Sequence, residues 1–259
     1  MLNITPIPAF SDNYIWMLQR SGSSAVVLVD PGETRRILRQ VDEQGIRPVA
    51  LLITHHHADH AGGIAQLLER FPALEVYGPA SENIAGVTHP VRQDDRIDIA
   101  EMNISFQILD VPGHTRGHVA YYGEGVLFCG DTVFACGCGR LFEGTPEQMT
   151  ESLEKIAALP AATKLYCAHE YTLSNIGFAR WVEPDNENLL QRDDDDMARQ
   201  EKGIPTVPST LDLELKTNPF LRYRVPAVKQ AAEEFAGKKL NSDAEVFAAI
   251  RRWKDTEYD

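Results

Sequence analysis

One segment constrains this chain of 259 residues more than any other: Thr-His-His-His-Ala-Asp-His, at residues 54–60. It directly follows residues 49–54 (VALLIT), an apolar run that predicts a buried strand. Gly62 and Gly63 come next and mark the opening of a predicted helix. A surface cluster or a tag has no reason to lie between a buried strand and a helix start. The placement therefore predicts that these histidines bind metal.

The spacing within the segment indicates two metal ions rather than one. Alternate side chains of an extended segment point the same way, so His55 and His57 can face one ion while His56 points elsewhere. As the chain bends toward the helix, Asp59 and His60 can face a second ion nearby. Neutral imidazole and carboxylate groups are ligands that suit zinc, iron or manganese, and we expect zinc in both positions.

Two ions need more ligands than this segment supplies, and three later residues meet the need. Each follows a predicted strand: His114 in PGHTRGH, Asp131 in GDT and His169 in AHEY. A single histidine at a strand end is usually a structural residue. All three, however, stand where the binding sites of α/β proteins collect. Together they complete the predicted metal site.

The order of predicted elements divides the chain near residue 172. Before it, β-rich runs alternate with helices, and strands are predicted at residues 25–30, 49–54, 104–110, 119–122, 126–130 and 164–167. Helices are predicted over residues 33–44 and from the capping box at 145–148 to before Pro160. After residue 172 strand signals vanish, and a second capping box at 242–245 starts a last helix. This predicts an α/β domain over 1–172 and a helical domain over 173–259, in which the acidic run 193–196 is a solvated helix face.

Charge and cysteine content narrow the class of protein. The net charge of −13 disfavours nucleic acid and anionic membranes as partners. No apolar run is long enough to span a membrane, and the first residues do not read as a signal peptide. None of the four cysteines has C-x-x-C spacing, which favours reduced thiols in the cytoplasm. Cys136 and Cys138 flank Gly137, but no base accompanies them, so a thiol site is a minor alternative.

The metal motifs resemble those of a known superfamily. T-H-x-H-x-D-H, P-G-H-T-x-G-H, G-D-T and C-x-H-E-Y look like the metallo-β-lactamase superfamily. The resemblance implies an αββα sandwich with metals at one edge, here followed by the helical domain. It also implies a division of the ligands: the first ion is held by His55, His57 and His114, the second by Asp59, His60 and His169, and Asp131 bridges both.

Further segments narrow the resemblance to one family. Residues 137–145, 168–172, 218–222 and 251–255 look like hydroxyacylglutathione hydrolases, also called glyoxalase II. The implied glutathione-binding positions are Arg140, Phe142, Tyr171, Arg251 and Lys254. Some family members carry Lys and Tyr where this chain has Arg140 and Phe142. Arg251 and Lys254 are three residues apart on the last predicted helix and so share a face, where an anion would lie between them.

The resemblance implies a hydrolase that cleaves the thioester of S-2-hydroxyacylglutathione, typically S-lactoylglutathione, to glutathione and a hydroxy acid such as lactate. Asp59 and Asp131 would serve catalysis as well as metal binding. We expect a cytoplasmic monomer with a small-molecule substrate. The alternatives are another hydrolase of the superfamily acting on a lactone or other ester, a thiol dioxygenase with one iron, and a non-catalytic metal-binding module.

Overall fold

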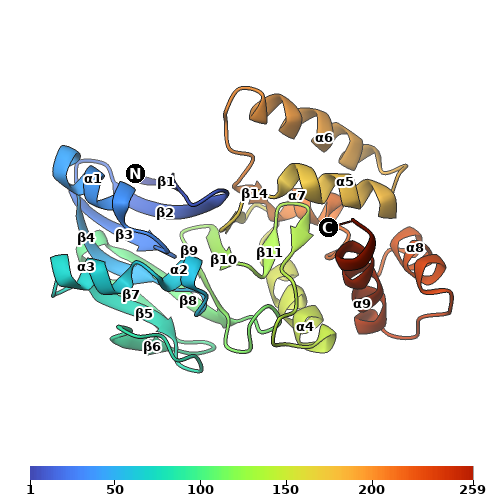
Figure 1. The fold of residues 1–259 in the computed structure, drawn as a ribbon, viewed down its shortest axis with the longest axis horizontal. Helices are drawn as coiled ribbons and strands as arrows, with labels where there is room; N and C mark the ends of the chain where they lie inside the picture. Colours follow the sequence, from blue (N-terminus) through green and yellow to red (C-terminus); the bar gives the residue numbers. More distant parts are fainter. Residues whose placement is uncertain (259) are drawn as a thin grey trace. The chain divides into compact units, whose positions relative to one another are not determined.

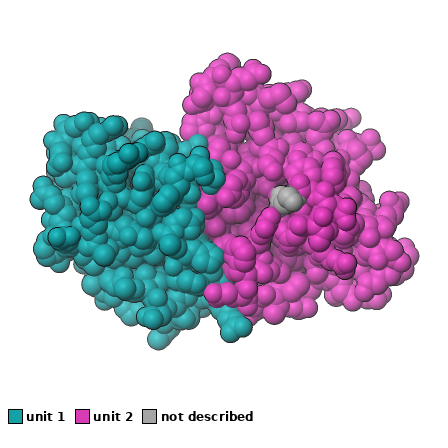
Figure 2. Space-filling model, viewed as in Figure 1, with its two compact units in different colours: residues 1–110, 115–130 teal, residues 111–114, 131–259 magenta. Residues whose placement is uncertain are grey.

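The computed structural model describes residues 1–258, which form two compact units. The first comprises residues 1–110 and 115–130, and the described part of the second comprises residues 111–114 and 131–258 (Figure 2). This division differs from the composition shift near residue 172, because residues 131–172 group with the C-terminal helices. The domain boundary at residue 172 stays a prediction. Within residues 1–258 no helix has the length and apolar character to cross a membrane.

The first unit is built on a mixed six-stranded sheet with strand order β1-β2-β3-β4-β5-β6 (Figure 1). Its strands are β1 (Leu2–Ala9), β2 (Asn13–Arg20), β3 (Ala25–Val29), β4 (Arg47–Leu52), β5 (Glu75–Pro79) and β6 (His89–Val91). The first three pair antiparallel, and β3 to β6 pair parallel. The connections carry α1 (Arg35–Gln44), α2 (Ala58–Ala61) and α3 (Ile64–Arg70).

The apolar runs of this sheet are buried on both faces, as parallel strands require. All five residues of β3 are buried. Val26 and Leu28 pack in one core with Ile37 of α1 and Ile64 of α3. Val27 alternates with them and is also fully buried, so the opposite face of the sheet is covered as well.

A second sheet of the first unit is an antiparallel meander of β7 (Arg96–Ile99), β8 (Ile104–Asp110), β9 (Val119–Gly123) and β10 (Val126–Gly130), with the 3₁₀ turn η1 (Ala100–Met102) between β7 and β8. The fully buried Tyr121 donates its hydroxyl hydrogen to the Ile53 carbonyl at 2.8 Å, which joins this sheet to the first. Two sheets with helices on the outer face of the first agree with the predicted sandwich.

The second unit is mainly helical. Its elements are β11 (Val133–Phe134), β12 (Gly137–Cys138), α4 (Pro146–Ala157), β13 (Lys164–Cys167), α5 (Thr172–Val182), α6 (Glu187–Gln200), β14 (Ser209–Thr210), α7 (Leu211–Thr217), α8 (Pro226–Ala236), α9 (Asp243–Trp253) and the π-helical turn η2 (Lys254–Tyr258). β11 pairs with β12, and β13 pairs with β14. Among residues 172–258 the only strand is the two-residue β14, so the predicted change to helices is confirmed.

The predicted helix caps are present. Thr145 and Gln148 form the reciprocal capping box of α4, and the Ser242 hydroxyl accepts from the Glu245 N–H at the start of α9. Gly45 ends α1 in the left-handed conformation, with φ at 66°.

The acidic run at residues 193–196 is only partly the solvated face that we expected. Asp194 and Asp195 are exposed, but Asp196 is buried and lies 3.2 Å from Arg192, one helical turn earlier. Arg192 also lies 2.7 Å from the fully buried Glu214 of α7. The prediction is wrong for Asp196 because the helix turns this carboxylate toward a buried cation.

Candidate metal centre and adjoining cavity

In the first unit, Asp30 organises the histidine-rich segment. This buried residue directly follows β3 and has a positive φ of 50°. Its carboxylate accepts hydrogen bonds from the Thr54 N–H and the Thr54 hydroxyl, both at 2.8 Å. It also accepts a hydrogen bond from Nδ1 of His60 at 3.0 Å. Because the Thr54 hydroxyl donates to Asp30, the contact of 3.0 Å between Thr54 Oγ1 and His55 Nδ1 is one in which the imidazole donates. Asp30 therefore engages Nδ1 of His60 directly and Nδ1 of His55 through Thr54, so Nε2 is the candidate metal-binding atom of both rings.

The remaining ligand candidates of this unit lie close to these two rings. Nε2 of His55 is 3.0 Å from Nδ1 of His57, and Nε2 of His60 is 3.4 Å from Oδ2 of Asp59. Asn13, at the start of β2, donates to the same Asp59 oxygen at 3.0 Å. Asp59 and His60 belong to the short helix α2, which sequence did not predict. The helix expected to open at the two glycines is α3, which begins at Ile64 after the N-cap Gly63 and ends at Arg70, so that prediction is confirmed. Within the first unit the segment thus brings together the four side chains predicted from it.

The two other histidines near this segment have different roles. His56 turns away and lies 3.0 Å from Glu82, which also accepts from the Thr115 hydroxyl and the Gly117 N–H. His118 stacks on His55, with ring centroids 4.6 Å apart and an angle of 18° between the planes. It packs beside a candidate ligand and supports the orientation of that ring.

In the second unit, one carboxylate lies between two imidazoles. Oδ2 of Asp131 is 3.4 Å from Nε2 of His114, and Oδ1 is 3.5 Å from Nε2 of His169. All three side chains are buried. A carboxylate that offers a different oxygen to each of two rings has the arrangement that a bridging ligand needs. Donor types, burial and spacing all fit the binding of divalent metal ions.

Neighbouring groups hold these imidazoles in place. His114 donates from Nδ1 to the Arg140 carbonyl at 2.8 Å, which leaves Nε2 for a metal ion. His169 stacks on Tyr171 at 4.8 Å with an angle of 9° between the rings, and meets the edge of Phe134 at 5.7 Å. Gly139 must be glycine here, because a Cβ would lie 2.0 Å from the Asp131 carbonyl oxygen.

A cavity of about 490 Å³ adjoins this set within the second unit. His114 and Asp131 form part of its lining, and Phe134, Phe142 and Tyr171 supply aromatic surface. The rest of the lining is Gly139, Arg140, Ser174, Asn175 and Lys254. The cavity therefore combines candidate metal ligands, aromatic walls and two cations, which suits an anionic small molecule.

Four of the five predicted substrate-binding residues line this cavity: Arg140, Phe142, Tyr171 and Lys254. The fifth, Arg251, is not among the lining residues and is 4% exposed. Its Nη1 donates to the Cys138 carbonyl at 2.9 Å, and its Nη2 lies 2.8 Å from Asp255. The shared helix face that we expected for Arg251 and Lys254 does not place both at the cavity.

Sequence reasoning missed Phe134, Ser174 and Asn175 as cavity residues. The last two could have been found, since they follow Tyr171 by one turn at the start of α5. Phe134 had no such signal, because only the fold brings the short strand β11 to the cavity.

The cysteines are not placed for nucleophilic chemistry. All four are buried and free of disulfide bonds. Burial raises the pKa of Cys136 and Cys167 to about 12 and that of Cys138 to about 11. These thiols stay protonated near neutral pH, which argues against the thiol-site alternative.

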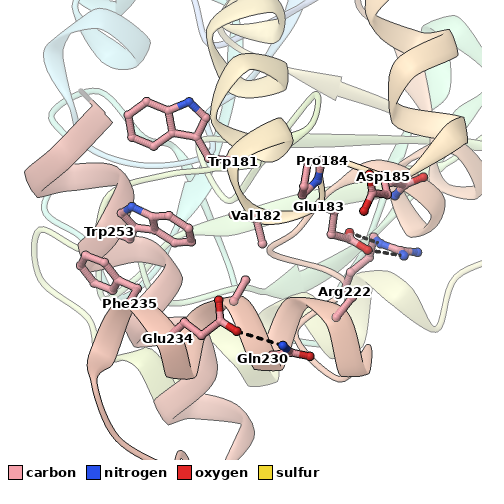
Figure 3. A pocket seen from close by; sticks show the side chains of 13 residues that line it. Trp181, Val182, Glu183, Pro184, Asp185, Arg222, Gln230, Glu234, Phe235 and Trp253 are labelled. Carbon is pink, nitrogen blue, oxygen red and sulfur yellow. Dashed lines mark hydrogen bonds and ion pairs between the residues drawn. The ribbon is translucent and has the colours of Figure 1, made fainter.

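A larger hollow of about 650 Å³, between the end of α5 and the helices α8 and α9, lacks this chemistry (Figure 3). Trp181, Phe235 and Trp253 form its aromatic side, and the described residues that line it include no histidine or cysteine. Its buried acid Glu183 is engaged by Arg222 through two hydrogen bonds of 2.7 and 2.8 Å. Donor chemistry rather than volume therefore identifies the smaller cavity as the candidate active site.

Comparisons with known proteins agree with the fold and with these side chains. The family described as "Metallo-beta-lactamase superfamily" matches residues 10–169, and the one described as "Hydroxyacylglutathione hydrolase C-terminus" matches residues 170–257. The ETHE1 structure from Myxococcus xanthus has a TM-score of 0.67 at 21% identity, and the match covers 100% of this chain and 93% of the ETHE1 chain. The structure titled TTHA1623 in a di-iron-bound form has a TM-score of 0.58 at 25% identity, with coverage of 84% and 99%. Fold and site define a member of the metallo-β-lactamase superfamily.

The relationship is narrower at the level of sequence. The hydroxyacylglutathione hydrolase of Alkalilimnicola ehrlichii is 51% identical over 255 residues, which are 98% of this chain and 99% of the relative. This chain belongs to the hydroxyacylglutathione hydrolase family.

Proposed function

We propose that this protein hydrolyses the thioester of S-2-hydroxyacylglutathione, typically S-lactoylglutathione, and releases glutathione and a 2-hydroxy acid such as lactate. One observation carries the proposal: the cavity that exposes His114 and Asp131 also presents Arg140, Tyr171 and Lys254. A reactive centre and groups that can bind an anionic peptide therefore share one cavity of the second unit. Family membership supports the same substrate class.

We further propose a binuclear metal centre made from the ligand sets of both units. One ion would be held by His55, His57 and His114, the other by Asp59, His60 and His169, with Asp131 as the bridge. The proposal is supported by the spacing within each unit and by the nitrogen atoms that Asp30 and the Arg140 carbonyl leave available. A solved relative in a di-iron-bound form supports the metal count. We expect zinc, while iron and manganese suit the same donors.

When bound, two such ions would lower the pKa of a coordinated water to about 7 and would stabilise negative charge on oxygen. The protein supplies the rest. Asp59, held by Asn13, has a carboxylate placed to accept a proton. The leaving thiol resembles cysteine, with a pKa near 8.5, so it departs as the thiolate without a dedicated acid.

The substrate is bound away from the reacting carbon. Arg140 and Lys254 would pair with the glutathione carboxylates, and Tyr171 adds an aromatic wall with a hydroxyl group. Phe142 offers a ring that is 64% exposed and meets the His114 edge at 5.2 Å, but no hydroxyl. We expect it to contribute apolar contact only. Arg251 does not line the cavity and would affect substrate binding indirectly, through its hydrogen bond to the Cys138 carbonyl.

Thiol release from S-lactoylglutathione, measured with and without a chelator, tests this function. We expect turnover that chelation abolishes and added zinc restores, with two ions per chain by elemental analysis. A matched thioester, S-lactoyl-N-acetylcysteamine, lacks the glutathione carboxylates and should be a much poorer substrate. One iron per chain with oxygen uptake would instead indicate the thiol dioxygenase. Absence of turnover with metal bound would favour the non-catalytic module.

We also propose that the protein works in the cytoplasm as a monomer and without nucleic acid or membrane partners. The four cysteines, none of which forms a disulfide bond, and the net charge of −13 support this setting.

A further inference from the structure

Asp255, in the π-helical turn after α9, faces two guanidinium groups with a single oxygen atom. Its Oδ1 lies 2.8 Å from Nη2 of Arg251 and 3.5 Å from Nε of Arg140. Arg251 is one helical turn earlier, whereas Arg140 follows β12 and is distant in sequence. The carboxylate therefore ties the end of the last helix to the loop that carries a cavity residue.

Arg251 is a fixed partner in this arrangement. Its guanidinium lies 5.1 Å over the ring of the fully buried Phe220 and donates to the Cys138 carbonyl at 2.9 Å. Cys138 and Arg140 stand two residues apart in the same loop. Arg251 and Asp255 thus hold this loop at two points, the Cys138 backbone and the Arg140 side chain.

The same loop reaches the candidate metal ligands. The Arg140 carbonyl accepts from Nδ1 of His114 at 2.8 Å, and both residues line the cavity. The Arg140 side chain is itself 52% exposed. A long side chain with that exposure samples many rotamers unless a neighbour restricts it. Rotamer freedom that is lost only when the ligand binds costs entropy and so weakens binding.

The charge of Asp255 is the informative feature. A carboxylate beside a cavity for an anionic substrate repels that substrate, so attraction of the substrate does not explain its presence. Pairing with the buried Arg251 explains part of it. Restricting Arg140 explains the second contact, since a cation held in one orientation binds a carboxylate better than a mobile one.

We propose that Asp255 is a positioning residue, which holds Arg140 toward the cavity so that Arg140 can bind a carboxylate of the glutathione moiety. This inference rests on the proposed function for the identity of the ligand. Asp255 is not among the residues that line the cavity, and it acts through Arg140.

The test combines Asp255→Asn with Arg140→Ala and the double variant. Asp255→Asn keeps the shape and removes the charge. We expect it to raise KM for S-lactoylglutathione roughly 10-fold, in the range typical of coupled neighbouring groups, and to change kcat less than about 2-fold. In the Arg140→Ala background the same substitution should have no further effect on KM. Asp255→Glu should restore most of the affinity because it keeps the charge.

Two controls separate positioning from a general structural effect. Asp212→Asn removes another carboxylate of this unit that pairs one turn away with a lysine, Lys216, and it should leave KM unchanged. S-lactoyl-N-acetylcysteamine should show the same KM with the wild type and with Asp255→Asn. A lower KM for Asp255→Asn would overturn the proposal, since it would mean that Asp255 only repels substrate. Additive effects of the two substitutions, or a loss confined to kcat, would overturn it as well.

Calorimetric binding of glutathione itself keeps this inference distinct from the proposed function. If the wild type binds glutathione without hydrolysing its thioesters, the proposed function fails, and roughly 10-fold weaker binding by Asp255→Asn still supports the role of Asp255. Equal binding by both proteins contradicts that role even where hydrolysis is confirmed. A wild type that neither binds glutathione nor hydrolyses its thioesters contradicts both proposals.

Discussion

The two units present their metal-ligand candidates in opposite ways. In the first unit all four belong to one segment, residues 55–60, and a single buried acid, Asp30, orients two of the rings. In the second unit His114, Asp131 and His169 come from separate parts of the chain, and backbone carbonyls and aromatic rings orient them. The first arrangement follows from local sequence, whereas the second exists only in the folded unit.

This difference separates two tasks. Two ligand candidates of the second unit, His114 and Asp131, line a cavity together with aromatic and cationic side chains that suit glutathione, so we expect substrate selection and metal binding to meet there. For the first unit we predict metal-dependent chemistry alone. Substitutions of ligand candidates in either unit should therefore lower turnover, and those of the cationic and aromatic residues at the second unit's cavity should mainly change substrate affinity.

The largest effect should come from Asp131→Ala, because this carboxylate lies between two imidazoles. We expect loss of most bound metal and a fall in turnover of about 10³-fold or more, since such ions contribute several kcal/mol of transition-state stabilisation. Elemental analysis and the thioester assay measure both. Full activity in this variant would show that Asp131 does not bridge the ions.

The neighbouring histidines His57 and His56 offer a matched pair within the first unit. His57→Ala should lower metal content and reduce turnover by about 10²-fold. Loss of a residue that only hydrogen-bonds to a metal ligand already costs up to about 10²-fold, and loss of a ligand itself should cost at least as much. His56→Ala should stay within a few-fold of the wild type, since His56 contacts Glu82 instead. Equal losses in the two variants would contradict the alternation of side chains along the segment.

Lys254→Ala and Arg251→Ala should both raise KM more than they lower kcat, by roughly 10-fold or more for a lost charge-assisted contact. They should differ in stability. Arg251 is buried and bonded to Cys138 and Asp255, so its loss should also lower the melting temperature, whereas Lys254→Ala should lower it less. A loss of kcat alone in either variant would remove that residue from substrate binding.

The smallest effect concerns the cysteines. Burial raises the pKa of Cys136 and Cys167 from 9.0 to about 12, so the folded state retains protons that the unfolded state releases. Their contribution to stability is complete below pH 9 and is lost as the pH rises from 9 toward 12. Iodoacetamide at pH 8 should leave all four thiols of the folded protein unmodified, as mass spectrometry can measure. Rapid labelling of Cys136 would contradict its burial.

Several parts of the fold could be predicted because their signals are local. The strands β3, β8 and β10, the cap at Thr145 and the stop at Gly45 follow from short runs of sequence. The hairpin of β1 and β2 and the strands β5 to β7 were not predicted. Their residues mix apolar and polar side chains, and pairing with neighbouring strands decides their conformation.

Sequence alone determined the chemistry available to this protein: which imidazoles and carboxylates follow strands, and which cations and aromatic rings accompany them. Tertiary structure decided how these groups are used. It placed Phe134, Ser174 and Asn175 at the cavity, turned Asp196 inward and set Arg251 behind the wall, beside Asp255. The physical reason is that helix caps and strand periodicity depend on neighbours along the chain, whereas burial and the orientation of a long side chain depend on contacts between distant segments.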